Sequence, residues 1–207
     1  ITKIMMMEKK SEKPKEELLP DKTNISDKIK PESTEIPEEI AVLALKDVVV
    51  FPQMVTALGV TTKNELKLLD TVLATNRFVV LVAQKDPDKE RLDTSDLYEI
   101  GTASIVLQML RMPDNTAKML VQGIARVRIK KFTDTDPFFK AKVKVVEDVL
   151  DKAGVEIEAL ATNAKNQFTK MVSISPHLPE ELKIVVVNIE PPGRLADLIT
   201  SHLNISI

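Results

Sequence analysis

The spacing of apolar residues in this 207-residue chain changes once, near Asp151. Before that point, over residues 36–147, apolar residues form short runs separated by turn residues, which is the pattern of β-strands. After it, over residues 152–207, they recur every three or four positions, which is the pattern of amphipathic helices. The chain is therefore expected to be an α+β protein, with a mixed sheet or small barrel that includes one helix, followed by a helical subdomain.

The first 35 residues differ in composition from the rest. They contain three prolines and no aromatic residue, and residues 1–39 hold eight Lys and ten acidic residues without any Arg. Such a segment buries too little apolar surface to offset its chain entropy, so residues 1–35 are expected to be a disordered charged tail. The chain starts at Ile1 and stops at Ile207 directly after a helical pattern, so we expect it to be a fragment.

Short apolar runs bounded by turn residues indicate the strands. The sequence Pro113-Asp-Asn-Thr116 separates two of them and predicts a hairpin. The acidic stretch 84–97 is expected to be a surface loop. The expected strands are Ile40–Leu45, Val48–Phe51, Met54–Val60, Phe78–Val82, Ile105–Leu110, Met119–Val121, Ala125–Phe132 and Phe139–Val146.

Four helices are expected. Thr62 and Glu65 form a capping box that opens a helix ending near Asn76. Two short helices should follow Pro179 and Pro192, although the β-branched run 184–187 in the first also suits a strand. The inward positions are expected to be Ile157, Leu160, Ala161, Ala164, Phe168 and Met171 in the long helix, then Leu182, Val185, Val186 and Ile189, then Leu195, Leu198, Ile199 and Leu203.

Composition excludes several kinds of chemistry. Without Cys, the chain has no disulfide, thiol nucleophile or thiolate zinc site, and its two His leave few other metal sites. The five glycines are widely scattered, so no phosphate-binding loop exists and ATP binding by this chain is not expected. No G-x-S-x-G motif is present and nothing marks a Ser-Lys pair. We therefore expect no catalytic, cofactor or metal residue in this chain.

Neither the targeting signals nor the net charge of the chain indicates a membrane or nucleic-acid partner. No apolar run reaches the ~20 residues of a membrane span, and the N-terminus lacks the features of a signal or mitochondrial targeting segment. The cytoplasm is therefore the expected compartment, with no membrane partner. The formal net charge is −2, so a nucleic acid would need a local basic patch.

Alternating cations provide one such patch. Arg126, Arg128 and Lys130 fall on one face of one expected strand, and residues Lys140, Lys142 and Lys144 fall on one face of the next. If these strands pair, the cations share a surface that suits several phosphate contacts. Aromatic residues do not alternate with the cations, however, so a solvated strand face is favoured over a nucleic-acid site.

Methionine and phenylalanine residues near turns form the other candidate surface. Unbranched, polarisable Met side chains adapt to varied partners, which suits a surface that binds many sequences. The competing interpretation is that Met109 and Met119, expected to lie opposite each other in the hairpin, fill the core. The substrate-binding candidates are Phe51, Met54, Met109, Met112 and Met119.

Four motifs in order carry a resemblance to a known family. The segments 42–54, 82–87, 96–102 and 193–204 resemble the amino-terminal domain of Lon-type ATP-dependent proteases. The chain departs from that pattern at Ala41 and Ala44, where the family usually has Pro. It departs also at Gln53, where the family usually has Gly, and at Thr61-Thr62, where Gly-Arg is common.

The resemblance implies a PUA-like β domain followed by helices. It implies that this segment captures unfolded or damaged protein substrates and supports a homo-hexamer. An ATPase module, with ATP and Mg, and a serine protease module with a Ser-Lys dyad would lie downstream, so this fragment would itself be non-catalytic and without a cofactor. Two alternatives stay open: a stand-alone PUA-like module that binds protein, and one that binds RNA.

Overall fold

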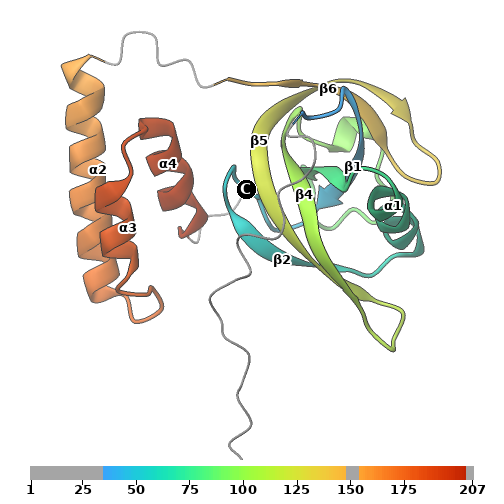
Figure 1. Ribbon diagram of the computed structural model, residues 1–207, viewed down its shortest axis with the longest axis horizontal. Helices are drawn as coiled ribbons and strands as arrows, with labels where there is room; N and C mark the ends of the chain where they lie inside the picture. Colours follow the sequence, from blue (N-terminus) through green and yellow to red (C-terminus); the bar gives the residue numbers. More distant parts are fainter. Residues whose placement is uncertain (1–34, 148–153, 204–207) are drawn as a thin grey trace, which may run out of the picture. The chain divides into compact units, whose positions relative to one another are not determined.

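The structure is a computed structural model that describes residues 35–147 and 154–203 (Figure 1). The expected tail, apart from Glu35, lies outside the described residues. Six strands lie within residues 39–145 and three α-helices within residues 155–201. The mixture is the α+β class expected from the sequence, whereas the division into separate domains stays a prediction.

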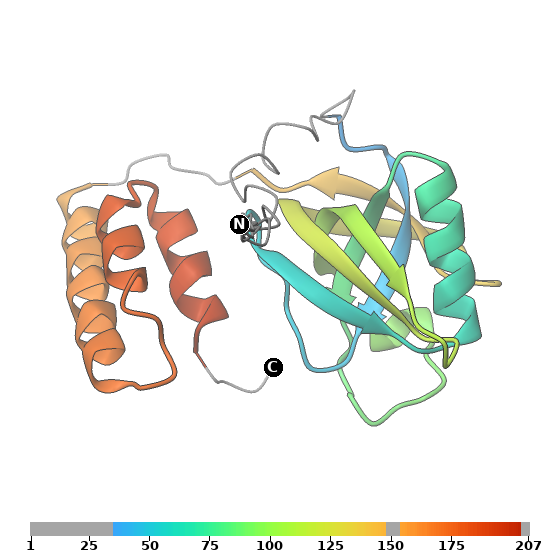
Figure 2. The ribbon, with the colours of Figure 1, turned by 60° about the horizontal axis from the view of Figure 1, so that its bottom comes forward.

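The sheet is mixed. Among the described strands, only β1 and β3 pair in parallel, and the other pairs are antiparallel. The strand order is β2-β5-β4-β3-β1-β6, and β6 also pairs with the second half of β5, so the sheet closes on itself (Figure 2). The strands are β1 Glu39–Leu45, β2 Val55–Val60, β3 Phe78–Ala83, β4 Ile100–Arg111, β5 Ala117–Asp134 and β6 Lys140–Val145.

One α-helix, α1 (Lys63–Ala74), covers the sheet. The expected capping box is confirmed: the Glu65 N–H donates to Thr62 Oγ1 over 3.2 Å, and the Thr62 N–H donates to the Glu65 carboxylate over 3.0 Å. Leu68 and Leu69 point from this helix into a core cluster that also contains Leu43 and Val79 from the sheet. The sheet and α1 therefore share one packed interior.

A second core cluster lies on the other face of the central strands. β3 contributes to both clusters, because Val79 and Leu81 face one while Val80 and Val82 face the other. This explains its continuous apolar sequence, which is typical of a strand buried on both faces. The segment between β3 and β4 contains only a short 3₁₀ helix, Thr94–Asp96, in agreement with the expected loop.

Two strand predictions need correction. Val48–Phe51 is a loop, because it pairs with no strand in the described part of the chain and Val48 and Val49 face solvent. The expected break between residues 121 and 125 is absent, since β5 continues through Gly123. A Cβ at Gly123 would lie 2.3 Å from the Phe51 carbonyl oxygen, so glycine here permits close backbone packing and does not mark a turn.

The helical segment contains α2 (Val155–Ile174), α3 (Leu182–Asn188) and α4 (Pro192–Ser201). The β-branched run 184–187 is helical. The core of this segment consists of Phe168, Val172, Val186, Ile189 and Leu195. No described helix is long and apolar enough to cross a membrane.

Several expected inward positions are exposed. Leu160 is 67% exposed and Ile157 39%, because both border a solvent-open hollow of about 190 Å³ between α2 and α4. On α3, Val185 is 44% exposed, since the seven-residue helix buries one narrow stripe centred on Val186. Leu203, beyond the end of α4, is 37% exposed.

Candidate functional site: an apolar groove

One wall of the candidate site is the loop between β1 and β2. Val50 is buried in the core, and its two preceding neighbours point outward, with Val48 40% and Val49 38% exposed. Phe51, half-buried, follows them. Because Val50 is buried while Val48 and Val49 are not, the loop is fixed to the core and still exposes two apolar side chains to solvent.

Hydrogen bonds hold this loop in place. The Thr102 hydroxyl donates to the Val50 carbonyl over 2.6 Å in a buried position. The Gln53 N–H donates to the Gly123 carbonyl over 2.8 Å, and the Gly123 N–H donates to the Met54 carbonyl over 2.9 Å. The wall is therefore fixed to β4 and β5 before any ligand arrives.

Gln53 has the left-handed backbone conformation, with φ 65°. This is the position where the family that the sequence resembles usually has Gly. Glycine adopts positive φ without steric cost, whereas other L-residues do so less easily. The turn Phe51–Met54 thus has a backbone geometry that glycine favours, although this chain has Gln at position 53.

The opposite wall is the entry to β4. The Tyr98 N–H donates to the Ala83 carbonyl over 3.1 Å, which fixes the chain just before the strand begins. Tyr98 is 40% and Ile100 37% exposed. At the base, a Cβ at Gly101 would lie 2.6 Å from the Leu81 carbonyl oxygen, so glycine keeps β3 and β4 close there.

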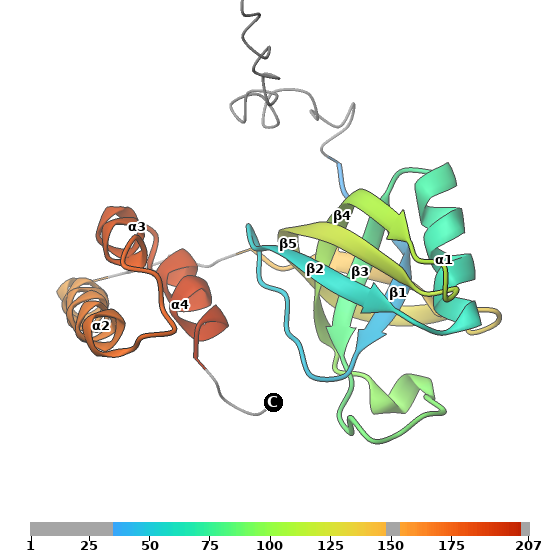
Figure 3. The ribbon, with the colours of Figure 1, turned by 90° about the horizontal axis from the view of Figure 1, so that it is seen from below.

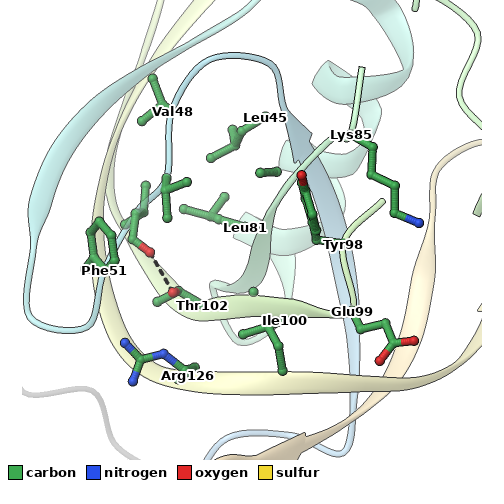
Figure 4. Close-up of a pocket in the computed structure, with 14 residues that line it drawn as sticks. Leu45, Val48, Phe51, Leu81, Lys85, Tyr98, Glu99, Ile100, Thr102 and Arg126 are labelled. Atoms are coloured by element: carbon green, nitrogen blue, oxygen red, sulfur yellow. Dashed lines mark hydrogen bonds between the residues drawn. The ribbon is translucent and has the colours of Figure 1, made fainter. Parts of the chain in front are cut away.

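Together these walls enclose an apolar groove of about 560 Å³. Figure 4 shows Val48 and Phe51 on one side and Tyr98 on the other, with Leu81 between them. The charged residues Lys85, Glu99 and Arg126 complete its lining. Its volume lies in the range of ligand pockets, and its converging apolar side chains suit an apolar group of a partner.

The five residues expected to bind substrate fall in different places. Phe51 lines the groove, and Met54 packs partly against the core. Met109 and Met119 lie opposite each other in the β4–β5 pair, as expected. Met119 is fully buried and has no surface to offer, whereas Met112, at the hairpin tip, is 36% exposed.

The Phe51–Met54 turn and Met112 do not form one pocket. Val55, next to the turn, pairs with Gln122, while Val60 pairs with Ala117 beside the hairpin tip. The two apolar sites therefore lie at opposite ends of β2, separated by a strand of six residues, or about 20 Å.

Reasoning from apolar runs alone missed Tyr98 and Ile100. Both lie about 50 residues from Val48 in sequence, so no local pattern connects them with it. The available signal was the motif spanning residues 96–102, one of the four that carry the family resemblance. In the structure this motif supplies the second wall of the groove.

The loop before Tyr98 is fixed by an ion pair. The Lys89 ammonium lies 2.7 Å from the Asp96 carboxylate, which also accepts the Asp93 N–H over 2.7 Å. These hydrogen bonds, with the Lys89 bond the stronger cause, hold the pKa of Asp96 below its ordinary value. The same Lys89–Asp96 hydrogen bond raises the pKa of Lys89.

The basic strands do pair. Arg128 lies opposite Lys144, and Lys131 lies opposite Lys142. A register shift between Ile129 and Lys131 puts Lys131, rather than Lys130, across from Lys142. Acidic neighbours offset part of this charge, since Glu99 lies 3.5 Å from Arg128 and Asp134 lies 3.5 Å from Lys140.

Comparison with known proteins identifies one matching family and several longer relatives. Residues 39–207 match the family described as the ATP-dependent protease La (LON) substrate-binding domain. A Lon protease of Dictyoglomus thermophilum is 42% identical over 176 residues, which are 85% of this chain and 22% of that protein. A Lon protease of Desulforamulus reducens is 36% identical over 170 residues, 82% of this chain and 21% of that protein.

A solved structure shares the fold. The N-terminal domain of the Mycobacterium avium complex Lon protease has a TM-score of 0.65 at 21% identity, and the match covers 80% of this chain and 83% of that one. This chain spans about a fifth of the length of the two curated relatives.

Proposed function

We propose that this chain, which belongs to the Lon substrate-binding domain family, selects unfolded or damaged polypeptides through its apolar groove. One observation carries the proposal: Val48, Val49, Tyr98 and Ile100 expose apolar side chains from two separate segments around a single groove. Unfolded chains expose the complementary apolar groups, whatever their sequence. The groove therefore recognises the unfolded state of a substrate rather than one motif.

The groove supports weak and adaptable binding. It accommodates few apolar side chains, and each buried methylene contributes only about 0.8 kcal/mol. Met54, Met109 and Met112 offer further apolar surface near β2 whose flexible side chains suit varied partners. In a homo-hexamer, several such domains would act on one substrate, and effective concentration would raise the apparent affinity.

The proposal for the whole protein follows the family resemblance and the relatives named Lon protease. This chain would select substrates, while downstream modules use ATP and Mg to unfold them and a Ser-Lys dyad to cleave them. The full-length protein would be a cytoplasmic, hexameric, ATP-dependent serine endopeptidase. The relatives, several times longer than this chain, give no support to a stand-alone binding module.

Nucleic-acid binding is the second candidate function. The cross-strand pairs Arg128–Lys144 and Lys131–Lys142 concentrate like charge on the β5–β6 surface. Phosphate contacts there would make binding strongly dependent on salt, whereas binding in the apolar groove would change little with salt. Salt dependence therefore separates the two functions.

The test measures binding of reduced, carbamidomethylated α-lactalbumin, which stays unfolded in native buffer, by fluorescence anisotropy. The double variant Val48→Asp, Val49→Asp places charge in the groove, and we expect binding to weaken at least tenfold. Val145→Asp is the matched control, because Val145 is also 40% exposed but lies on β6, outside the groove. Equal weakening by both variants, or unchanged binding by the double variant, would contradict the proposal.

A further inference from the structure

Strand β2 leaves one backbone edge unpaired among the described residues. It stands at the end of the strand order and pairs only with β5 (Figure 3). The bond from the Gly123 N–H to the Met54 carbonyl fixes the phase of this ladder and makes Val55 and Gln122 a pair without direct hydrogen bonds. The N–H and C=O groups of Val55, Ala57 and Gly59 consequently point away from β5.

These three residues are also exposed. Val55 is 52% exposed, and Ala57 and Gly59 are exposed as well. Proteins usually protect an open edge with charged residues, proline or a bulge. β2 has the sequence Val-Thr-Ala-Leu-Gly-Val, with no charge and no proline, and its register with β5 is regular throughout. Its edge is thus suited to accept another strand.

The position of this edge connects the two apolar sites. β2 begins beside the Phe51–Met54 turn, whose Phe51 lines the groove, and ends beside the hairpin tip that carries Met112. An extended segment of about six residues paired along β2 would reach from one site to the other. Backbone pairing requires no particular sequence, which matches the demands on a selector of many substrates.

We propose that an extended segment of the unfolded substrate adds to the open edge of β2 as an extra strand. This inference rests on the proposed function and specifies how the bound polypeptide is held. Main-chain hydrogen bonds to Val55, Ala57 and Gly59 supply affinity, as in other cases of strand addition. The groove and the Met112 tip then receive apolar side chains near the two ends of the segment.

The first test is amide hydrogen exchange by NMR, with and without the carbamidomethylated α-lactalbumin. Strand addition protects the amides of Val55, Ala57 and Gly59 on binding. The amides of Thr56 and Leu58 are internal controls, because they already face β5 and should change little. Uniform protection of all five amides, or of none, would overturn the inference.

The second test replaces Ala57 with proline. Because the Ala57 N–H points away from β5, Ala57→Pro removes an edge donor without removing a bond of the β2–β5 ladder. We expect about tenfold weaker binding, equivalent to one or two backbone hydrogen bonds, while Ala57→Val, which keeps the donor, binds like the wild type. Equal affinity of both variants for the unfolded protein would count against strand addition.

A third measurement needs no variant. A short peptide of alternating valine and threonine should compete for the site, whereas the same peptide with every amide N-methylated should not.

The three tests together separate the strand inference from the proposed function. If the groove variants lose binding while the edge amides stay unprotected and neither Ala57→Pro nor peptide N-methylation weakens binding, the strand inference is wrong and the proposed function stands. If the wild-type chain fails to bind any unfolded polypeptide, both are wrong.

Discussion

The sheet and the helical segment bury their apolar residues to different extents. In the sheet, consecutive residues of β3 are inaccessible, with Val79 and Val80 both 0% exposed. In the helical segment, only Phe168 and Val172 of the twenty-residue α2 are buried, and Val155 and Ile174 near its ends are more than 80% exposed. A strand with neighbours on both edges and both faces is enclosed, whereas a helix is covered only where another helix reaches it.

Apolar residues are therefore exposed for different structural reasons in the two regions. In the sheet region, the loop that exposes Val48 and Val49 is anchored directly after them, by the backbone bonds of Val50, Gln53 and Met54 to β4 and β5. In the helical segment, Leu160 is exposed because it borders an open hollow between α2 and α4. The Val48–Phe51 loop is an ordered apolar surface, whereas the exposure of Leu160 reflects sparse packing between helices.

The largest expected effect is on the helical core. Phe168 is 3% exposed and packs edge-to-face against the His202 ring, with 6.1 Å between the ring centroids. Phe168→Ala should lower the free energy of unfolding by about 3–5 kcal/mol, as expected for a large-to-small core change. Leu160→Ala, on the same helix, should cost less than about 1 kcal/mol because Leu160 is 67% exposed. Urea unfolding followed by circular dichroism measures both, and equal costs would show that Leu160 is as well packed as Phe168.

The stability of the sheet region should be sensitive to substitution of Gly123. Gly123→Ala forces a methyl group against the Phe51 carbonyl, and we expect a loss of about 3 kcal/mol in stability. Gly59→Ala is the control, since nothing lies within 4 Å of a Cβ there. That variant should keep or slightly raise the melting temperature, because alanine loses less entropy than glycine in a strand. A stable Gly123→Ala protein would show that the turn is not fixed against β5.

A smaller effect is expected at Gln53. Gln53→Gly removes the steric cost of φ 65°, part of which is cancelled by the entropy of glycine, so stability should rise by about 0.5–1 kcal/mol. The measurement is calorimetric unfolding at neutral pH. A decrease in stability would mean that the Gln53 side chain itself stabilises the turn.

The smallest effect concerns the loop before Tyr98. Lys89→Met should raise the pKa of Asp96 toward its ordinary value, because its strongest hydrogen-bond donor is lost. Asp96 has a lowered pKa in the folded state, so its contribution to stability is present above the unfolded-state pKa and disappears as the pH falls through the folded-state pKa. An NMR titration of the Asp96 carboxyl group checks this, and an unchanged pKa would show that Lys89 does not hold the loop.

Local sequence signals anticipated much of the fold but only part of the site. The capping box at Thr62, the hairpin around Pro113 and the pairing of Met109 with Met119 follow from short-range chemistry. The groove depends on contacts between residues far apart in sequence, such as the bond between Thr102 and Val50. Periodicity likewise placed Leu160 on the inner face of α2 but could not show that nothing fills the space beside it.

Recognition of unfolded chains through the apolar groove is tested most directly by an NMR titration of the chain with unfolded α-lactalbumin at low and high salt. We expect shifts at the amides of Val48, Val49, Tyr98 and Ile100 that persist at high salt, because binding there is apolar. Shifts confined to the basic β5–β6 surface and lost at high salt would contradict it, since phosphate-like or acidic partners, not exposed apolar groups, would then be the ligands of this domain.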